Sequence, residues 1–369
     1  MKSSVIVLAW SLLAAVVCSC GSSTEDPGAQ PTKADMGRKI FFDKTMSNPA
    51  GQACSSCHDE STGFSDPNHA LVSPGVVTGL FGNRNAPSIG YAQYSPALHF
   101  DATDSVYIGG YFYDGRTNNL EQQAKQPFLN HLEMNNESVA MVVAKIKAAE
   151  YYSQFVDLYG SSNDDQTIYN NVADAIANFE RTSFFARFTS KYDYYLKGEA
   201  TLSEQEQRGL DLFKDTAKAK CANCHITDPD EASGKVLFTD FTYDNIGIPK
   251  NPNNPFYTIP SKENPDGANA LDRGLGAFLS AHENDGQFKV PSLRNVEISA
   301  PYFHNGFFTK LEDLVHWYNV RDSGIKAGFF PPPEILENVN EEELGNLHLT
   351  QQEEADIVAF MKTLTDGYK

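Results

Sequence analysis

Two short segments of the 369-residue chain repeat the same residue types at the same spacing. ACSSCH covers residues 53–58, and KCANCH covers residues 220–225. Each has the C-x-x-C-H pattern of covalent c-type haem attachment. Two thiols on one helical turn can reach the two vinyl groups of a haem, and the imidazole that follows can bind the iron as proximal ligand. The residues concerned are Cys54, Cys57, His58, Cys221, Cys224 and His225.

Three other uses of a cysteine pair compete with haem attachment. A redox-active C-x-x-C pair needs no histidine after it and no second copy. A zinc site needs further ligands, and the only other cysteines, Cys18 and Cys20, lie in the leader. A disulfide within each motif leaves the repeated histidine unexplained. The pattern therefore favours two covalently bound haem c groups.

The chain begins with a segment typical of exported bacterial proteins. One lysine precedes an apolar run at residues 5–17, which is too short to cross a bilayer as a mature helix. The run ends in a cysteine segment that resembles a lipobox, so residues 1–20 are predicted to be a lipoprotein-type signal peptide with Cys20 as the lipid anchor. Release into the periplasm without lipid is the alternative. Residues 21–33 are predicted to be a flexible tether.

The length and charge of the chain limit its architecture and its partners. A chain of this length can form two domains, each with its own core. The net charge of −19 argues against nucleic acid and anionic membrane surfaces as partners. The predicted location is the periplasmic side of a bacterial envelope, with membrane contact through the lipid alone.

The segments around the two motifs are also duplicated. Amphipathic segments at 37–43 and 209–215 precede the motifs, and similar helical segments at 171–182 and 353–364 close each half. Thr201 and Glu204 suggest a capping box ahead of the second amphipathic helix. Strand signals are sparse. We therefore predict a mainly α fold of two cytochrome c-like domains, each with one covalent haem.

The sequence resembles the bacterial di-haem cytochrome c peroxidases, with features of their methylamine-utilisation branch, which matures a quinone cofactor. Beyond the haem motifs, the resemblance rests on RNAPS (84–88), FYDGRTNNLEQQA (112–124), LEM (132–134) and VPSLRNVEISAPYFHNG (290–306). It implies a peroxidatic haem in residues 34–190 and an electron-transfer haem in residues 191–369. It also implies hydrogen peroxide as substrate and a small cytochrome c or cupredoxin as electron donor, and it admits a homodimer.

The resemblance assigns roles around the first haem. Glu133 would move a proton between the two oxygens of the peroxide, with Gln123 beside it. Tyr113 stands where the family usually has a tryptophan between the haems, and it could relay an electron or donate a hydrogen bond. This replacement counts against quinone maturation.

A second histidine caps the resting iron of the first haem in many members of this family. Here Val76 follows Ser73-Pro74-Gly75 where that histidine would stand, and His69 lies upstream as an expected surface residue. The hypothesis is that the iron bound by His58 is five-coordinate at rest and open to peroxide.

The second haem would have an unusual distal ligand. A capping box at Thr309–Glu312 predicts a helix on which Tyr318 shares the apolar face and His316 does not. The electron-transfer peroxidases have an axial methionine where Tyr318 stands, and no methionine occurs between Met141 and Met361. The resemblance therefore implies Tyr318 as the axial ligand of the second iron.

Two further binding roles rest on the resemblance alone. His304 is expected to contact a haem propionate. A calcium ion between the domains would be bound by the Asn85 side chain and the backbone carbonyls of Ser299 and Pro301, because oxygen ligands suit calcium.

Three functions remain open on the sequence. The favoured one is a cytochrome-c peroxidase that reduces hydrogen peroxide to water. The second is a di-haem oxidase of a protein or organic substrate that uses peroxide-derived ferryl chemistry, which Tyr318 favours and Tyr113 disfavours. The third is a di-haem electron carrier, which has no use for Glu133 and Gln123 beside an open iron.

Overall fold

The computed structural model describes residues 31–369. The predicted signal peptide, most of the tether and the proposed anchor Cys20 lie outside the described residues. Helix α1 begins at Lys33, the last residue of the predicted tether, and the Thr32 side chain caps it by accepting a hydrogen bond from the Asp35 N–H at 3.2 Å. No helix within residues 31–369 is long and apolar enough to cross a membrane.

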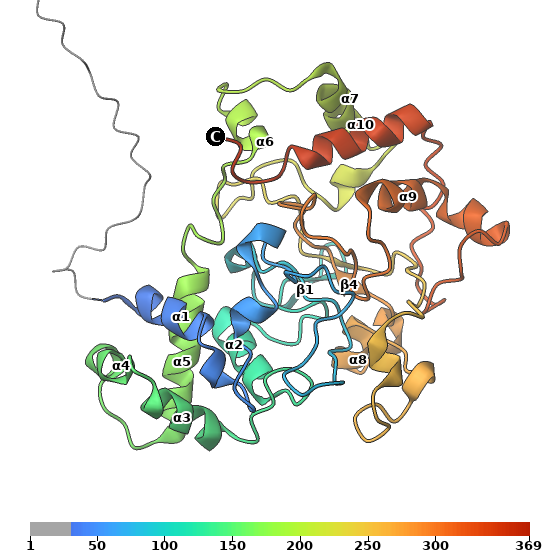
Figure 1. Cartoon of the computed structure of the whole chain (residues 1–369). Helices are drawn as coiled ribbons and strands as arrows, with labels where there is room; N and C mark the ends of the chain where they lie inside the picture. The colour runs from blue at the N-terminus through green and yellow to red at the C-terminus, as the bar shows by residue number, and fades with distance from the viewer. Residues whose placement is uncertain (1–30) are drawn as a thin grey trace, which may run out of the picture. The chain divides into compact units, whose positions relative to one another are not determined.

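Helices joined by long irregular segments make up most of the described chain (Figure 1). The helices are α1 (Lys33–Phe41), α2 (Leu120–Leu129), α3 (Val139–Ala148), α4 (Tyr152–Tyr159), α5 (Asp165–Glu180), α6 (Lys191–Leu196), α7 (Glu204–Lys214), α8 (Leu275–Leu279), α9 (Leu311–Lys326) and α10 (Gln351–Lys362). The strands are β1 (His99–Asp101), β2 (Val106–Ile108), β3 (Tyr243–Asp244) and β4 (Phe288–Lys289). β1 pairs with β2 and β3 with β4, both antiparallel. The prediction of a mainly α fold is confirmed.

The same close helix crossing occurs twice. Helix α1 lies against α5, and α7 lies against α10 (Figure 1). A Cβ atom added to Gly37 of α1 would lie 1.9 Å from the carbonyl oxygen of Ala175, and one added to Gly209 of α7 would lie 1.9 Å from that of Asp356. Only glycine allows backbones to approach this closely. The duplication seen in the sequence therefore extends to the packing.

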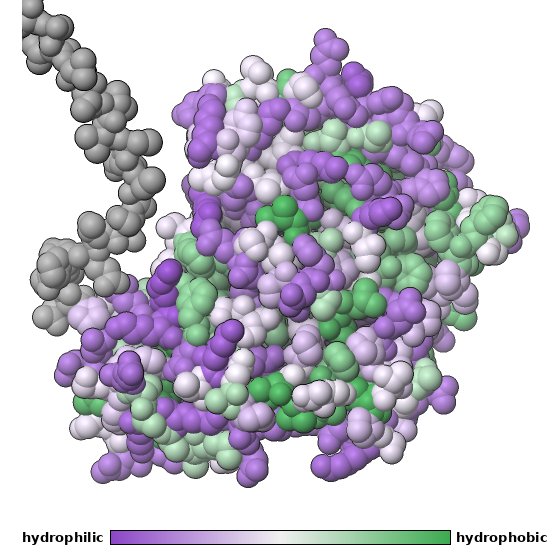
Figure 2. All heavy atoms as spheres, viewed as in Figure 1, coloured by the Kyte–Doolittle hydropathy of each residue, from purple (hydrophilic) through white to green (hydrophobic). Residues whose placement is uncertain are grey.

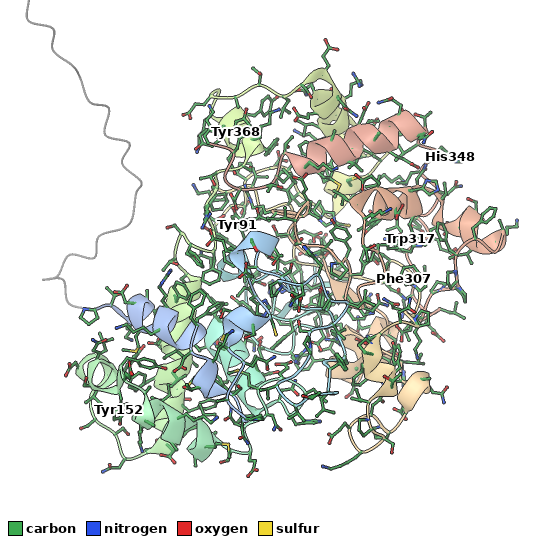
Figure 3. The ribbon with its side chains drawn as sticks, viewed as in Figure 1. Tyr91, Tyr152, Phe307, Trp317, His348 and Tyr368 are labelled. Atoms are coloured by element: carbon green, nitrogen blue, oxygen red, sulfur yellow. The ribbon has the colours of Figure 1, made fainter. Side chains whose placement is uncertain are left out.

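Two apolar cores follow the two halves of the chain. On the face shown in Figure 2, hydrophilic residues predominate and apolar residues form separate small patches. The first core includes Met36, Ile40, Phe41, Val142, Val172, Ile176 and Phe185. The second includes Leu210, Phe213, Phe238, Leu311, Trp317, Ile357 and Phe360. Trp317 on α9 and Phe307 on the loop before it both pack in this second core (Figure 3).

The short strands help to join the two halves. Ile108, at the end of β2, forms an isolated bridge with Thr242, just before β3. The hydroxyl of Tyr243 donates a hydrogen bond to the Gly109 carbonyl, and the Lys289 N–H donates one to the Tyr113 carbonyl at 2.9 Å. Residues 32–369 accordingly form one compact unit. The division into domains at residue 190 stays a prediction.

Two predicted capping boxes are wrong. Helix α7 is capped by Ser203 with Glu206, because the S/T-x-x-E pattern occurs in two overlapping frames and the chain remains extended through Ser203. Helix α9 has Lys310 at its N-cap, with no side-chain cap, so Thr309 does not cap it. The helix itself begins at Leu311, within the predicted segment.

Candidate functional site

Both cysteine motifs face one internal cavity of about 450 Å³. This volume lies within the range of about 300–1,000 Å³ usual for ligand and cofactor sites. The thiols of the four cysteines are free, so the disulfide interpretation finds no support. Within residues 31–369, no group of three or more His, Cys, Asp or Glu residues lies together in a way that could hold a metal ion.

Each motif folds as a tight turn that puts its two cysteines and its histidine on the cavity wall. The N–H groups of Cys57 and His58 donate to the Cys54 carbonyl at 3.1 and 3.0 Å. In the second motif, the equivalent bonds to the Cys221 carbonyl are 3.4 and 2.9 Å. Both turns are single turns of 3₁₀-helix, so the expected one-turn spacing of each thiol pair is present.

The two histidines are oriented in the same way. The Nδ1 atom of His58 is 3.0 Å from the Phe64 carbonyl, and that of His225 is 3.0 Å from the Phe238 carbonyl. Such a bond leaves Nε2 as the free nitrogen for a metal. Burial lowers the pKa of His58, and it lowers that of His225 to about 4, so both rings are neutral and able to bind iron. The cavity, thiols and imidazoles thus fit two c-type haems.

Glu133 and Gln123 line the same cavity as His58. Asn130 follows α2 directly, and its side-chain amide donates to Glu133 Oε1 at 2.8 Å. Burial raises the pKa of the Glu133 carboxyl, and this outweighs the charge of Arg116 and the hydrogen bond from Asn130, which both lower it. A carboxyl whose pKa is raised by burial holds a proton more readily than a solvated carboxylate, which suits a group that takes up and returns a proton.

Neither His69 nor Val76 contributes to the cavity wall. His69 is exposed, and its Nδ1 atom lies 2.7 Å from the Ala300 carbonyl. The N–H of Val76 donates to the Glu133 carbonyl at 2.9 Å, which ties this loop to the Glu133 segment. The geometry agrees with the hypothesis of an open first iron, which stays a prediction.

Tyr113 and the predicted calcium ligands lie together between the two halves. The Tyr113 hydroxyl is 3.5 Å from Asn85 Oδ1 and 3.5 Å from the Phe303 carbonyl, too far for strong hydrogen bonds. Asn85, Ser299 and Pro301 line the cavity with it. The Asn85 amide nitrogen donates to two nearby carbonyls at 3.2 Å, which leaves its oxygen directed elsewhere. Calcium at this place stays a prediction.

Tyr318 lines the cavity from α9, whereas His316 is exposed and pairs with Glu354, its Nδ1 atom 2.9 Å from the carboxylate. Burial raises the pKa of the Tyr318 hydroxyl, so the free side chain is a neutral phenol. The helix departs from α geometry at Val320, two residues later. The structure therefore separates the two side chains as the sequence predicts, and ligation by Tyr318 stays a prediction.

His304 is buried in the cavity wall, with its ring stacked on Phe288 at 3.7 Å between centroids. Its Nε2 atom is 3.9 Å from Glu334 Oε2, and neither atom has a hydrogen-bond partner among the described residues. A buried donor beside the cavity is suited to a haem propionate.

The half-buried Lys289 and the buried Glu180 also line the cavity, and neither was predicted from the sequence. Lys289 donates to the Gly110 carbonyl, and burial lowers the pKa of its amine to about 8. Lys289 could have been found from the sequence, because it directly precedes the segment 290–306 that carries the family resemblance. Glu180 lies within the closing segment 171–182, whose face toward the core is otherwise apolar.

The mainly helical fold and the two C-x-x-C-H turns on one cavity define a class of protein built for two c-type haems. The family model for the di-haem cytochrome c peroxidases matches residues 31–201. The chain is 34% identical over 372 residues to the methylamine utilization protein MauG of Paracoccus denitrificans, covering 96% of this chain and 94% of that protein. It is 30% identical to the cytochrome c peroxidase Ccp of Escherichia coli, covering 78% and 54%.

The fold is also similar to that of a solved structure. The diheme peroxidase BthA from Burkholderia thailandensis superposes with a TM-score of 0.78 at 33% identity, covering 91% of this chain and 86% of that one. The chain belongs to the di-haem cytochrome c peroxidase family, which implies two c-type haems, and it is an oxidoreductase.

Proposed function

We propose that this protein reduces hydrogen peroxide to water with electrons from a small redox protein. The observation that carries the proposal is the buried Glu133 carboxyl, with its raised pKa, on the same cavity as the His58 imidazole. An electron carrier would not need a proton-exchanging group there.

The residues of the first site divide the work of peroxide cleavage. Cys54, Cys57 and His58 hold the first haem, whose iron supplies the redox chemistry when bound. Glu133 accepts the proton from one peroxide oxygen and returns it to the other, which leaves as water. The amide of Asn130 holds the Glu133 carboxyl in place at 2.8 Å, and Gln123 orients the peroxide from α2.

The second half would receive the electrons. Cys221, Cys224 and His225 would hold the second haem, and the Tyr318 hydroxyl would bind its iron. An anionic phenolate stabilises the oxidised iron, which suits a haem that must store oxidising equivalents. Tyr113 lies between the halves and relays electrons between the two sites. The buried Lys289 amine and His304 are suited to pair with haem propionates, and Asn85, Ser299 and Pro301 would bind calcium.

The cellular setting completes the proposal. Residues 1–20 direct export, and Cys20 carries the lipid that holds the enzyme on the periplasmic side. The net charge of −19 favours a donor with a basic docking surface, either a small cytochrome c or a cupredoxin.

A second candidate function is oxidation of a protein or an organic substrate. The 34% identity to a methylamine utilization protein and the position of Tyr318 favour it. Tyr113, in place of the family's tryptophan, weighs against quinone maturation. The two candidates differ in turnover: a peroxidase consumes peroxide continuously with a reduced small cytochrome, whereas an oxidase does so only when its own substrate is present.

Stopped-flow absorbance tests the proposal. The fully oxidised holoprotein is mixed with one equivalent of hydrogen peroxide, and the haem bands are followed. An immediate change, followed by steady oxidation of a reduced cytochrome c under excess peroxide, is expected. No reaction until one haem is reduced would refute the open first iron, and no peroxide consumption in any redox state would refute the peroxidase assignment.

A further inference from the structure

Glu180, the last residue of α5, is a buried carboxyl with no assigned task. Only 5% of its surface is exposed, and its Oε2 atom has no hydrogen-bond partner among the residues that the structure describes. The adjacent Arg181 does not neutralise it, because that guanidinium pairs with Glu121 of α2 at 2.7 Å. Burying a carboxylate without a partner is costly, so the group is held neutral unless a positive charge is nearby.

Glu180 lies on the cavity wall beside the first cysteine motif. Cys54, Tyr111 and Leu120 line the same cavity. Burial raises the pKa of the Cys54 thiol, and the negative charge of Glu180 raises it further. A haem attached through Cys54 would share this cavity with the Glu180 carboxyl.

The second half of the chain has an apolar residue at the equivalent place. Gly37 meets the Ala175 carbonyl and the Phe179 Cβ, and Gly209 meets the Asp356 carbonyl and the Phe360 Cβ. These two crossings align Ala175 with Asp356 and Phe179 with Phe360. The next residues are Glu180 and Met361, and both line the cavity. The carboxyl is therefore a feature of the first site alone, although the packing around it is repeated.

We propose that Glu180 is the proton-binding group of the first haem site, taking up one proton when that haem gains an electron and releasing it when the electron leaves. The electron comes from the redox donor and resides on the ferric iron, which becomes ferrous. The proton comes from solvent and converts the Glu180 carboxylate to a carboxylic acid. The net charge of the site is thus unchanged by reduction. The proposal rests on haem attachment at Cys54 and Cys57, and not on peroxidase chemistry.

The surroundings of Glu180 support a carboxyl that titrates near neutrality. Burial raises its pKa to about 8, although the charge of Arg181 lowers it and that of Glu121 raises it. A ferric haem adds positive charge and favours the carboxylate, and a ferrous haem favours the acid. On α1, Lys33 pairs with Asp174, and the Arg38 guanidinium lies over the rings of Phe179 and Phe184. The Lys289 amine lies 5.6 Å from the centre of the Tyr111 ring.

Redox titration of the holoprotein tests the proposal. The wild type, Glu180→Gln and the control Glu137→Gln, a glutamate on the exposed surface, are each checked for two haems by their pyridine haemochrome spectra. The midpoint potentials are then measured between about pH 6 and pH 9, on either side of neutrality. In the wild type and in Glu137→Gln, the potential of one haem should fall with pH, with a slope approaching about one proton per electron. In Glu180→Gln that slope should be lost, while the potential of the other haem keeps its pH dependence.

An infrared difference spectrum between the reduced and oxidised holoprotein gives a second readout. The wild type should gain the carbonyl band of a carboxylic acid on reduction, and the band should shift in D₂O and be absent from Glu180→Gln. An unchanged pH slope in Glu180→Gln, or a wild type without that band, overturns the inference. A protein without covalent haem would instead overturn the proposed function, and proton coupling in a peroxide-inactive holoprotein would overturn only the peroxidase assignment.

Discussion

Burial raises the pKa of the Glu133 carboxyl, which we propose as the proton-exchanging group of the first site. Removing its acidity should therefore affect turnover before it affects folding. We expect Glu133→Gln to lower the rate of peroxide turnover by about 10²- to 10⁴-fold, the usual contribution of a general acid–base group. The isosteric amide retains the shape of the side chain, so haem content should not change. Glu137→Gln, four residues later on the exposed surface, is the control and should retain full activity. Equal rates in both variants would remove Glu133 from the mechanism.

A second prediction concerns Tyr318 as the proposed ligand of the second haem iron. Tyr318→Phe removes the hydroxyl and should change the visible spectrum of the oxidised holoprotein in the bands of one haem only. His316→Ala, two residues earlier on the exposed face of α9, should leave both haem spectra unchanged. A spectral change in His316→Ala, or none in Tyr318→Phe, would show that the ligand was assigned to the wrong side chain.

The sequence could reveal these residues only where a local pattern marked them. The C-x-x-C-H spacing predicted the two haem motifs, and the family resemblance predicted roles for Glu133, Gln123 and Tyr318. All of these residues line the same cavity. Glu180 was missed because a glutamate near the end of a helix is usually exposed. Its burial depends on the crossing of α5 with α1 and on contacts from α2, which the sequence of α5 does not contain.

The N-terminus of α7 differs from its prediction, because Ser203 and not Thr201 caps the helix. Ser203 accepts a hydrogen bond from the Glu206 N–H at 3.2 Å, whereas Thr201 is exposed before the helix begins. Ser203→Ala should therefore lower the free energy of unfolding by about 0.5–2 kcal/mol, and Thr201→Ala should change it by less than about 0.5 kcal/mol. Denaturant titration of the holoprotein followed by circular dichroism measures both. A larger loss of stability in Thr201→Ala than in Ser203→Ala would show that Thr201 caps the helix after all.

Helical periodicity predicted segments that overlap α1, α5, α7, α9 and α10, because each of these helices buries an apolar face. It did not predict α2, α3, α4, α6 or α8. It could not predict the pairing of Ile108 with Thr242 or of Lys289 with Tyr113, which join segments more than a hundred residues apart. The need for glycine at the two helix crossings likewise depends on contacts between segments far apart in the sequence. Gly37 and Gly209 stand in segments that the sequence marks as a repeat, but only the packing shows why each must be glycine.

At the scale of the whole molecule, a buried ion network joins the two halves. Arg84 donates to Asp114 at 2.7 Å within the first half and to Asp272 of the second half at 2.6 and 2.7 Å. Burial alone would raise the pKa of the Asp272 carboxyl, but the charge and hydrogen bonds of Arg84 outweigh burial and hold that pKa far below its usual range. The contact between the halves thus includes ion pairs as well as hydrogen bonds, and it is sensitive to acid.

Removal of the Arg84 guanidinium should weaken this contact at neutral pH. Arg84→Met leaves the Asp272 carboxylate without its cation, whereas Asp114 keeps its ion pair with Arg116 at 2.9 Å. The loss should lower the free energy of unfolding by about 3–5 kcal/mol. Arg273→Met is the matched control, because that guanidinium is 34% exposed and pairs with Asp285 near the surface. Its loss should cost less than about 1 kcal/mol. Equal losses in the two variants would show that the network does not hold the halves together.

The same pair of variants predicts a difference in acid stability. A carboxyl whose pKa is lower in the folded state stabilises the fold fully above its unfolded pKa of about 3.9, and this stabilisation is lost as the pH falls toward the folded value. Denaturant titrations of the wild type and of Arg273→Met should therefore show stability falling steeply below about pH 4. In Arg84→Met the fall from Asp272 should be absent, because without the guanidinium nothing outweighs the burial that raises this pKa. A slope as steep in Arg84→Met as in the wild type would assign the acid sensitivity to other carboxyls.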